Sequence, residues 1–472
     1  MIGFIRKLLK DRRGNALAIA CAAMPLIIGC AGLATDTIEW TLWKRQLQRA
    51  ADSAALAGVY DRAQATNGAT TNTPTAVCND LAVNLHTWMN LLGTSPCTGS
   101  VGSYSNIQYP AADAFVSNKV QVTLRVQQSL PFSSLFMSTA PTIQAVATAG
   151  AVSYGGTPCM LALNTTGTAI NNSGNTTVSA PTCIFYSDSA SSNSAAAGGS
   201  SAITAKAVAG VGGIQSSNNW NVQSYLPYSP SLPDPLAPPS TTAVTPDPSD
   251  MKCAGHWVTG NGNGNGNGNG GNGNGTPTWV NDALTDGVDI TTMRDASGNQ
   301  ANCFTSISVG SNRSLTIPSN WNGPLYVNGG NVNLQGAFTC ASCSIVLTNT
   351  DTSSTATIGT FSSNAQATNN ITAPTTGTFK GVAVYQDRRA SGNIDKINGG
   401  TSNVVNGVVY FPNDTLWLNG TGNSVSLCAM YVAKNLVFNG NSTIAISSAA
   451  DAACFGIGLP NTQSVSIVRL IA

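Results

Sequence analysis

The densest group of charged side chains in the second half of the chain lies in "YQDRRASGNIDK", residues 385–396. It contains Asp387, Arg388, Arg389 and Asp395. Convergent carboxylates are what a glycoside hydrolase uses for acid–base chemistry. The same residues would also suit a solvated loop at the edge of a β structure, which is the simpler interpretation. The cluster is therefore a candidate for binding or cleaving an acidic polysaccharide and for little else.

Two other motifs approach known chemistry without completing it. "YSDSASS" nearly matches the Asp-x-Ser-x-Ser of a von Willebrand-type metal site, but Ala190 stands two residues after Asp188, where the first serine ligand belongs. Cys340 and Cys343 have thioredoxin spacing, but strand-like segments flank them, so no helix N-terminus would lower a thiol pKa. We expect a structural bridge or two free buried thiols at this pair.

The two histidines of the chain offer no further chemistry. His86 and His256 lie far apart in sequence, and no serine triad or zinc site can be assembled around them. The sequence also contains no nucleotide-binding loop. We therefore expect no enzyme activity, no catalytic residue, no cofactor and no metal site.

The composition indicates β structure and excludes a nucleic-acid partner. Only 9% of the 472 residues are charged, and 21 basic side chains nearly cancel 20 acidic ones, so no basic surface for nucleic acid exists. The 48 glycines and the abundance of Asn, Ser and Thr favour turn-rich β structure over long soluble helices. We expect a mainly β protein.

A short repeat predicts how the β structure is organised. "LYVNG" at 325–329, "LWLNG" at 416–420 and "LVFNG" at 436–440 each join a short strand to an Asn-Gly turn, and the last two lie twenty residues apart. A strand and a turn that recur at this period are typical of one coil of a parallel β-helix, in which asparagines at equivalent turns can form ladders. An antiparallel β-sandwich with hairpins at the Asn-Gly pairs is the alternative.

The cysteines indicate an oxidising compartment. Cys21 and Cys30 fall within an apolar run, and the ten that follow form an even set, as in periplasmic or extracellular proteins. Spacing alone does not fix the connectivity. Sequence neighbours suggest bridges joining Cys78 to Cys97, Cys159 to Cys183, Cys253 to Cys303, and Cys428 to Cys454.

An apolar run from Asn15 to Ala34, with Pro25 near its middle, could cross a membrane. As a helix it would reach ~30 Å, which matches the hydrocarbon core of a bilayer. Five basic residues precede the run and three follow it closely, so the positive-inside rule places the N-terminus in the cytoplasm. The run predicts a permanent single-pass anchor.

Three processing reactions are alternatives to that anchor. "LIIGC", ending at Cys30, loosely resembles a lipobox, and "GLA" before Thr35 fits a signal-peptidase site. Gly14 could end a pilin-type leader, but Ile19 stands where such leaders usually carry glutamate.

The helical pattern continues past the apolar run as far as Gly58. "RQLQRAADSAALAG", residues 45–58, contains neither Gly nor Pro before that glycine and repeats small or apolar residues near helical spacing. A stripe of alanines usually packs closely against another element, and we expect the outer half of this helix to pack against the chain's own next module.

This N-terminal segment resembles TadG and related TadE/G-like proteins of the Flp, or tight-adherence, pilus machinery. The resemblance covers about residues 10–60 and implies an uncleaved anchor on a bitopic envelope protein that helps to build or anchor adhesive pili. The residues that carry it, besides "RRGNALAIA" and Pro25, are Asp36, Arg45, Leu47, Gln48, Ala50, Ala51 and Asp52.

Residues 61–153 predict a small α+β module. Its helix is expected over residues 75–92, followed by one strand with alternating Val and Leu at residues 120–126 and a second in "TIQAVATAGAVS". Farther along, the Pro-rich residues 225–255 and the Gly-Asn tract at 260–275 predict a flexible insertion.

The expected organisation follows from these features. The sequence predicts a cytoplasmic stub at 1–13, a transmembrane helix at 14–35, its extension at 36–60, the α+β module at 61–153, a first β-helical part at 154–224, the flexible insertion at 225–285 and the main β-helical part at 286–472.

The sequence and the resemblance together imply a non-enzymatic inner-membrane protein with a periplasmic C-terminal domain. Its expected partners are the inner membrane and other Flp pilus-machinery or cell-envelope components. A lipoprotein or cell-surface location is the alternative. Two other functions remain open, namely a surface adhesin or carbohydrate-binding β-solenoid, and a β-helical polysaccharide-degrading enzyme.

Overall fold

The computed structural model describes most of the chain. The described residues are 15–65, 72–85, 91–92, 106–113, 115–156, 158–238, 240, 243–258, 277–364, 366–399, 403–420, 423–426, 428–441, 443–446 and 464–471. Some sequence-based expectations fall outside these ranges, namely those on the stub at 1–13, Gly14, His86, Cys97, Cys454 and the Gly-Asn tract.

The chain folds into two units. Unit 1 comprises Met1–Ser153 and Val468–Ala472, and unit 2 comprises Tyr154–Ile467. The division shows that unit 2 is inserted between two segments of unit 1. The expected main β-helical part at 286–472 thus ends earlier, because its last residues belong to the first unit.

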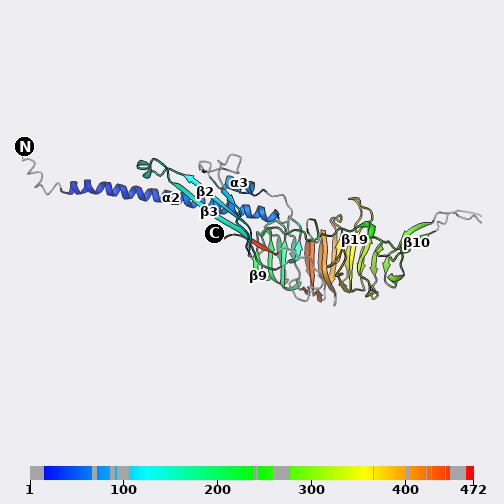
Figure 1. Cartoon of the computed structure of the whole chain (residues 1–472). Helices are drawn as coiled ribbons and strands as arrows, with labels where there is room; N and C mark the ends of the chain where they lie inside the picture. The colour runs from blue at the N-terminus through cyan, green and yellow to red at the C-terminus, as the bar shows by residue number, and fades with distance from the viewer. Residues whose placement is uncertain are drawn as a thin grey trace, which may run out of the picture. The chain divides into compact units, whose positions relative to one another are not determined.

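Helix α2, Asn15–Ala65, is the central element of unit 1 (Figure 1). It runs without a break through Pro25 and joins the apolar run to the expected extension. By length and composition it can cross a membrane. Large apolar side chains between Ile19 and Leu42 are exposed, whereas Trp43 and later apolar residues are buried. The large apolar side chains of the helix therefore change from exposed to buried near Trp43, whereas the polar Asp36 is already buried.

The second helix, α3, Thr73–Asn84, is shorter than the sequence predicts. The side chain of Asn72 accepts a hydrogen bond from the Thr75 N–H at its start. At its end Leu85 is already extended, and Leu91 forms a β-bridge with Val126. The expected end at residue 92 was wrong because Leu91 pairs with a strand instead of continuing the helical face.

A four-stranded sheet completes unit 1, in the order β1 (Asn106–Gln108), β2 (Val116–Gln127), β3 (Thr142–Ser153) and β28 (Ser466–Leu470). Strands β2 and β3 form an antiparallel hairpin that places Val120, Val122 and Leu124 opposite alanines. A short 3-10 helix, η1, Ser133–Leu135, lies in the loop that joins them. Because alanine is small, one face of the hairpin leaves room for a helix to approach its backbone.

Unit 2 is a parallel β-helix. Its 22-stranded sheet is built from parallel ladders, so the alternative of an antiparallel β-sandwich is wrong. "LWLNG" pairs residue by residue with "LVFNG", from Leu416 opposite Leu436 to Gly420 opposite Gly440. Asn164 also donates a 2.8 Å hydrogen bond to Asn435, as expected of an asparagine ladder.

The strands of unit 2 are mostly short, although three of them contain 11, 12 and 17 residues, and two others form a separate antiparallel pair. They are β4 Pro158–Ala162, β5 Ile170–Asn172, β6 Thr177–Ser187, β7 Ala195–Ala197, β8 Ala202–Gly210, β9 Trp220–Leu226, β10 Gly255–Val258, β11 Thr278–Asn281, β12 Leu284–Thr285, β13 Cys303–Phe304, β14 Ile307–Val309, β15 Ser314–Thr316, β16 Gly323–Asn328, β17 Val332–Leu334, β18 Ala337–Cys340, β19 Cys343–Thr348, β20 Phe361–Ser363, β21 Thr368–Thr372, β22 Val382–Gln386, β23 Ile394–Gly399, β24 Val404–Gly420, β25 Asn423–Ser426, β26 Ala429–Gly440 and β27 Thr443–Ile446, with 3-10 helices η2 Pro248–Asp250 and η3 Ile290–Thr292.

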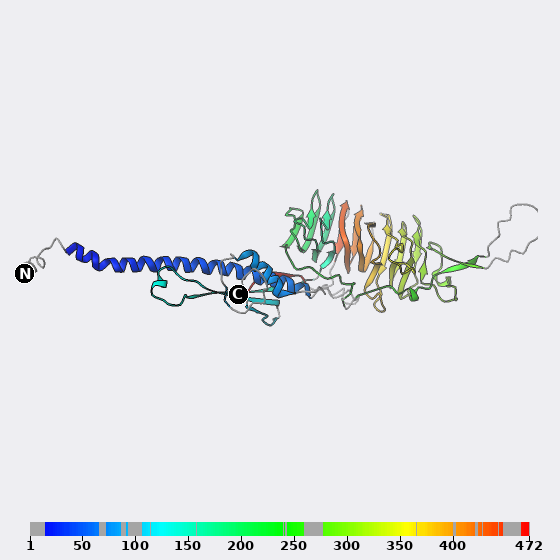
Figure 2. The ribbon, with the colours of Figure 1, turned by 90° about the horizontal axis from the view of Figure 1, so that it is seen from above.

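The coils are not stacked in sequence order. Strand β4, the first of the solenoid, pairs with β26, one of the last (Figures 1 and 2). From β4 the coils proceed to β9 at one end, and the chain resumes with β12 at the other end. A connection must therefore pass along the whole stack.

The Pro-rich segment, residues 227–254, makes this connection, and we call it the strap. About 28 residues in extended form reach roughly 85 Å, whereas each coil adds only ~4.8 Å, so the strap is long enough. Leu232, Leu236 and Val244 of the strap are buried with aromatic side chains of the coils. The expected flexible insertion is therefore ordered in its Pro-rich part, because its apolar side chains find a surface even though its prolines cannot join a ladder.

Disulfides cross-link the solenoid. Cys159 is bonded to Cys183, and Cys253 to Cys303, which are pairs that sequence neighbours suggest. Cys340 and Cys343 are also bonded to each other, so this pair is a bridge rather than two free thiols. Two further cysteines, Cys78 and Cys428, are disulfide-bonded.

Shortening a buried strap side chain should loosen the coils beneath it. Leu236→Ala leaves a cavity where a side chain only 1% exposed is packed, so we expect a loss of about 2–5 kcal/mol in local stability. Hydrogen–deuterium exchange of the full chain should report faster exchange in β22 and β24. Val258→Ala, at a site 40% exposed, is the control and should leave these strands unchanged. Equal exchange in both variants would contradict a packed strap.

Candidate functional site in the membrane-proximal helix

The motif residues of α2 include a buried face. Leu47, Ala50 and Ala51 are at most 1% exposed, and they belong to one apolar cluster with α3 and the β2–β3 hairpin. A Cβ atom added at Gly58 would lie 2.9 Å from Cγ1 of Val120 and 3.0 Å from Cγ2 of Val77. The helix therefore packs against its own module, as expected, and Gly58 lies at a close contact with both α3 and β2.

The polar motif residues lie beside this face. Nε2 of Gln48 donates to Oδ1 of Asp52 at 2.8 Å and to the carbonyl oxygen of Val146 on β3 at 2.9 Å. Gln48 thus links the helix to the backbone of the sheet. Arg45 is exposed and remains open to a partner.

Asp36 fixes the hairpin loop to the helix. Its Oδ1 accepts from the Phe132 N–H at 2.8 Å and its Oδ2 from the Ser133 N–H at 2.6 Å, and the Ser133 hydroxyl also donates to Oδ2. Burial of the carboxyl opposes its charge, but the hydrogen bonds from Ser133 and Phe132 outweigh that effect and hold the Asp36 pKa below its ordinary value. The carboxylate is therefore charged and anchors η1.

Sequence reasoning found Asp36 but missed its partners. Phe132 and Ser133 lie 96 and 97 residues farther along the chain, and no local pattern connects them to the helix. Gly32 was missed as well. A Cβ atom there would lie 2.2 Å from Cδ2 of Phe132, so the phenyl ring contacts the helix backbone itself.

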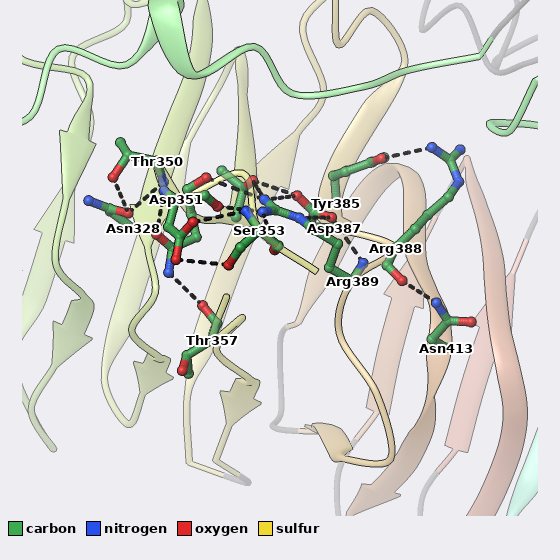
Figure 3. A network of polar contacts seen from close by, with 12 residues as sticks. Asn328, Thr350, Asp351, Ser353, Thr357, Tyr385, Asp387, Arg388, Arg389 and Asn413 are labelled. Carbon is green, nitrogen blue, oxygen red and sulfur yellow. Dashed lines mark hydrogen bonds and ion pairs between the residues drawn. The ribbon is translucent and has the colours of Figure 1, made fainter. Parts of the chain in front are cut away.

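The charged cluster of the β-helix binds its own chain. Nη2 of Arg389 lies 2.7 Å from Oδ2 of Asp387 (Figure 3). The Thr348 hydroxyl donates to the same carboxylate oxygen at 2.7 Å. The Arg389 guanidinium also donates to carbonyl oxygens of Asp351 and Ser353. Oδ1 of Asp387 accepts from the backbone N–H and Nε of Arg389, so both oxygens of this carboxylate are bonded within the chain.

Arg388 points to the strap instead of to a binding cleft. Its guanidinium donates to the carbonyl oxygens of Leu236 and Val244 and lies 5.3 Å from the centroid of the Tyr410 ring. The Tyr410 hydroxyl in turn donates to Oδ2 of Asp234 on the strap at 2.5 Å. The arginine therefore satisfies the backbone of a segment that has no ladder of its own.

The remaining acids of interest are buried. Asp395 is fully buried and its Oδ1 accepts from the Phe361 N–H at 2.6 Å, while burial and the nearby Asp414 carboxyl raise the Asp395 pKa to about 8. Asp188 accepts from the Leu232 N–H of the strap at 2.9 Å, and burial raises its pKa to about 7. Both carboxyl groups are therefore buried and bonded to backbone N–H groups of their own chain.

The described residues assemble no metal site around these charges. Within them, no group of three or more His, Cys, Asp or Glu side chains is placed to hold a metal ion. A polar pocket of the β-helix is lined by other residues, among them Lys252, Asn302, Asn322 and Tyr326. The Asp387 cluster does not contribute to it.

Removing the Asp36 carboxylate should release the hairpin loop. Because the folded pKa lies below the ordinary value of 3.8, its contribution to stability is present above that pH and is lost as the pH falls through the folded pKa. We expect Asp36→Asn to speed hydrogen exchange at Phe132 and Ser133 near neutral pH. In the parent chain, exchange at these two residues should become faster as the pH falls through the folded pKa of Asp36, and the substitution should abolish this increase. Glu39→Gln is the control, and a matching increase in that variant would contradict a specific tether.

Asp395 should make the solenoid less stable as the pH rises. Its folded pKa of about 8 exceeds the ordinary 3.8, so its favourable contribution is complete below pH 3.8 and declines up to about pH 8. The decline is at most about 1.4 kcal/mol per pH unit. We expect Asp395→Asn to reduce the difference between the denaturant midpoints of unfolding measured at pH 5 and at pH 8. An unchanged difference would argue against the raised pKa.

One protein family matches the segment that contains the motif residues of α2. Residues 14–66 match the model of the Flp pilus-assembly TadE/G-like family, a range that coincides with α2. No curated protein and no solved structure matches the chain. The match confirms the resemblance drawn from the anchor and the motif helix, and the chain therefore carries an N-terminal TadE/G-like domain.

Proposed function

We propose that this protein is a membrane-anchored, non-enzymatic component of the cell envelope that takes part in assembling or anchoring Flp-type pili. The observation that carries the proposal is the coincidence of the TadE/G-like segment with α2. The same helix supplies an apolar segment that can cross a membrane and a small-residue face that is buried in unit 1. The domain thus ties a folded module to the membrane.

The proposed topology places the N-terminus in the cytoplasm and both folded units in the periplasm. Basic residues ahead of the apolar run support this orientation. The disulfides Cys159–Cys183 and Cys253–Cys303 fit an oxidising compartment. Lipidation at Cys30 is the competing outcome, and it would remove residues 1–29 from the mature protein.

A non-enzymatic role accounts for the way the β-helix uses its charges. Asp387 and Arg389 bind each other, and Arg388 binds the strap. The proposed partners are therefore other proteins of the pilus machinery or of the envelope, bound along the surface of the solenoid. No step of polysaccharide cleavage is assigned to these residues.

Complementation of a deletion strain tests the proposal. The strain should lose surface pili, measured as pilin in sheared filaments, and the full chain should restore them. A version in which a cleavable signal peptide replaces residues 1–34 should reach the periplasm without restoring pili, because the folded units are no longer held at the membrane. The proposal would be contradicted if this soluble version restored surface pili, or if the deletion strain had normal pili. Intact mass of the purified protein distinguishes a chain that begins at Met1 from one that begins at Cys30.

A second candidate function is direct attachment through the β10–β11 hairpin. Trp257 is 59% exposed and its ring packs edge-on against Trp279 with 5.2 Å between centroids, while Val258 and Val280 are also exposed. An apolar aromatic patch of this kind is typical of a binding surface. Trp257→Ala would then abolish surface attachment while leaving pilus number normal, whereas unchanged attachment would remove this candidate.

A further inference from the structure

The loop that joins β2 and β3 exposes several large apolar side chains. Leu135 is 74% exposed, Phe136 75% and Met137 52%. No charged residue occurs between Arg125 and Lys206 except Asp188, so the whole loop is uncharged. An exposed apolar cluster without charges is costly in water and usually marks a contact surface. We call residues 130–137 the hairpin tip.

The position of the hairpin tip is fixed by α2. Asp36 binds the backbone of Phe132 and Ser133, and the Phe132 ring contacts the helix at Gly32. Both views of the structure show this end of the hairpin beside α2 (Figures 1 and 2). Gly32 lies within the last turn of the apolar run from Asn15 to Ala34. The tip is therefore level with the place where the helix leaves the membrane.

We propose that the hairpin tip is a second membrane contact, which inserts Leu135, Phe136 and Met137 into the interfacial layer of the bilayer that α2 crosses. The inference rests on the proposed membrane anchor. Burial of these apolar side chains in the bilayer would remove them from water, which is favourable. Serines 129, 133, 134 and 138 around them suit the headgroup layer, where hydroxyls keep hydrogen-bond partners.

Continuity with the anchor selects lipid over a protein partner as the occupant. The same membrane that covers the exposed side chains of α2 from Ile19 to Leu33 extends beside Gly32, where the tip lies. Two contacts with one bilayer would also hold α2 at a fixed rotation and tilt. The hydrogen bonds from Phe132 and Ser133 to Asp36 then have a clear role, because they keep the hairpin tip at the depth of the membrane interface.

Environment-sensitive probes on the full chain test the inference. Phe136→Cys is labelled with a fluorophore in a Cys21→Ser, Cys30→Ser background and reconstituted into phosphatidylethanolamine–phosphatidylglycerol vesicles. Phe115→Cys is the matched control, since Phe115 is 74% exposed at the opposite end of β2. A third chain, with Cys21→Ser alone, carries the probe on Cys30 and reports insertion of the anchor itself.

The inference predicts that lipids with a nitroxide near the top of the acyl chain quench the Phe136 probe, while aqueous iodide does not reach it. The Phe115 probe should show the reverse pattern. Iodide quenching at both positions overturns the inference. Protection from iodide without quenching by the nitroxide lipid also overturns it, because protein then covers the tip. An unquenched Cys30 probe overturns the anchor, and with it the membrane contact of the tip.

Discussion

The close packing of one face of α2 against the β2–β3 hairpin is the interaction on which unit 1 depends. The helix presents alanines and Gly58, the hairpin presents alanines of β3, and the larger residues of β2 fill the space between them. Small residues on both sides let the backbones approach, so a helix that could be only a membrane anchor becomes the core of a folded module. Asp36 extends this contact to the edge of the apolar run by binding η1.

The insertion of unit 2 between β3 and β28 imposes a second constraint. These two strands are neighbours in the sheet of unit 1, so the chain enters and leaves the solenoid near its middle, where β4 pairs with β26. A parallel stack that begins in its middle needs a return path from one end to the other. The strap provides it, and Asp188, Tyr410 and Arg388 satisfy its polar groups.

This arrangement explains why the charges that suggested chemistry contact groups of the chain itself in the described structure. Asp387 and Arg388 are adjacent in one loop. Arg388 binds the strap, whereas Asp387 binds Arg389. The groups for which binding is proposed are of another kind, namely exposed apolar side chains of the hairpin tip and of the β10–β11 hairpin.

The sequence by itself determined the features that depend on local periodicity. The apolar run, the helical spacing up to Gly58 and the repeat of "LWLNG" and "LVFNG" predicted the anchor, its extension and the parallel coils, because each pattern depends only on the types and spacing of residues along one segment. Only the tertiary structure decided which distant segments meet. The contact of Asp36 with Ser133, the pairing of β4 with β26, the order in the strap and the end of α3 depend on partners far along the chain. A local pattern states that a side chain needs a partner, but the partner is selected by the packing of the whole fold.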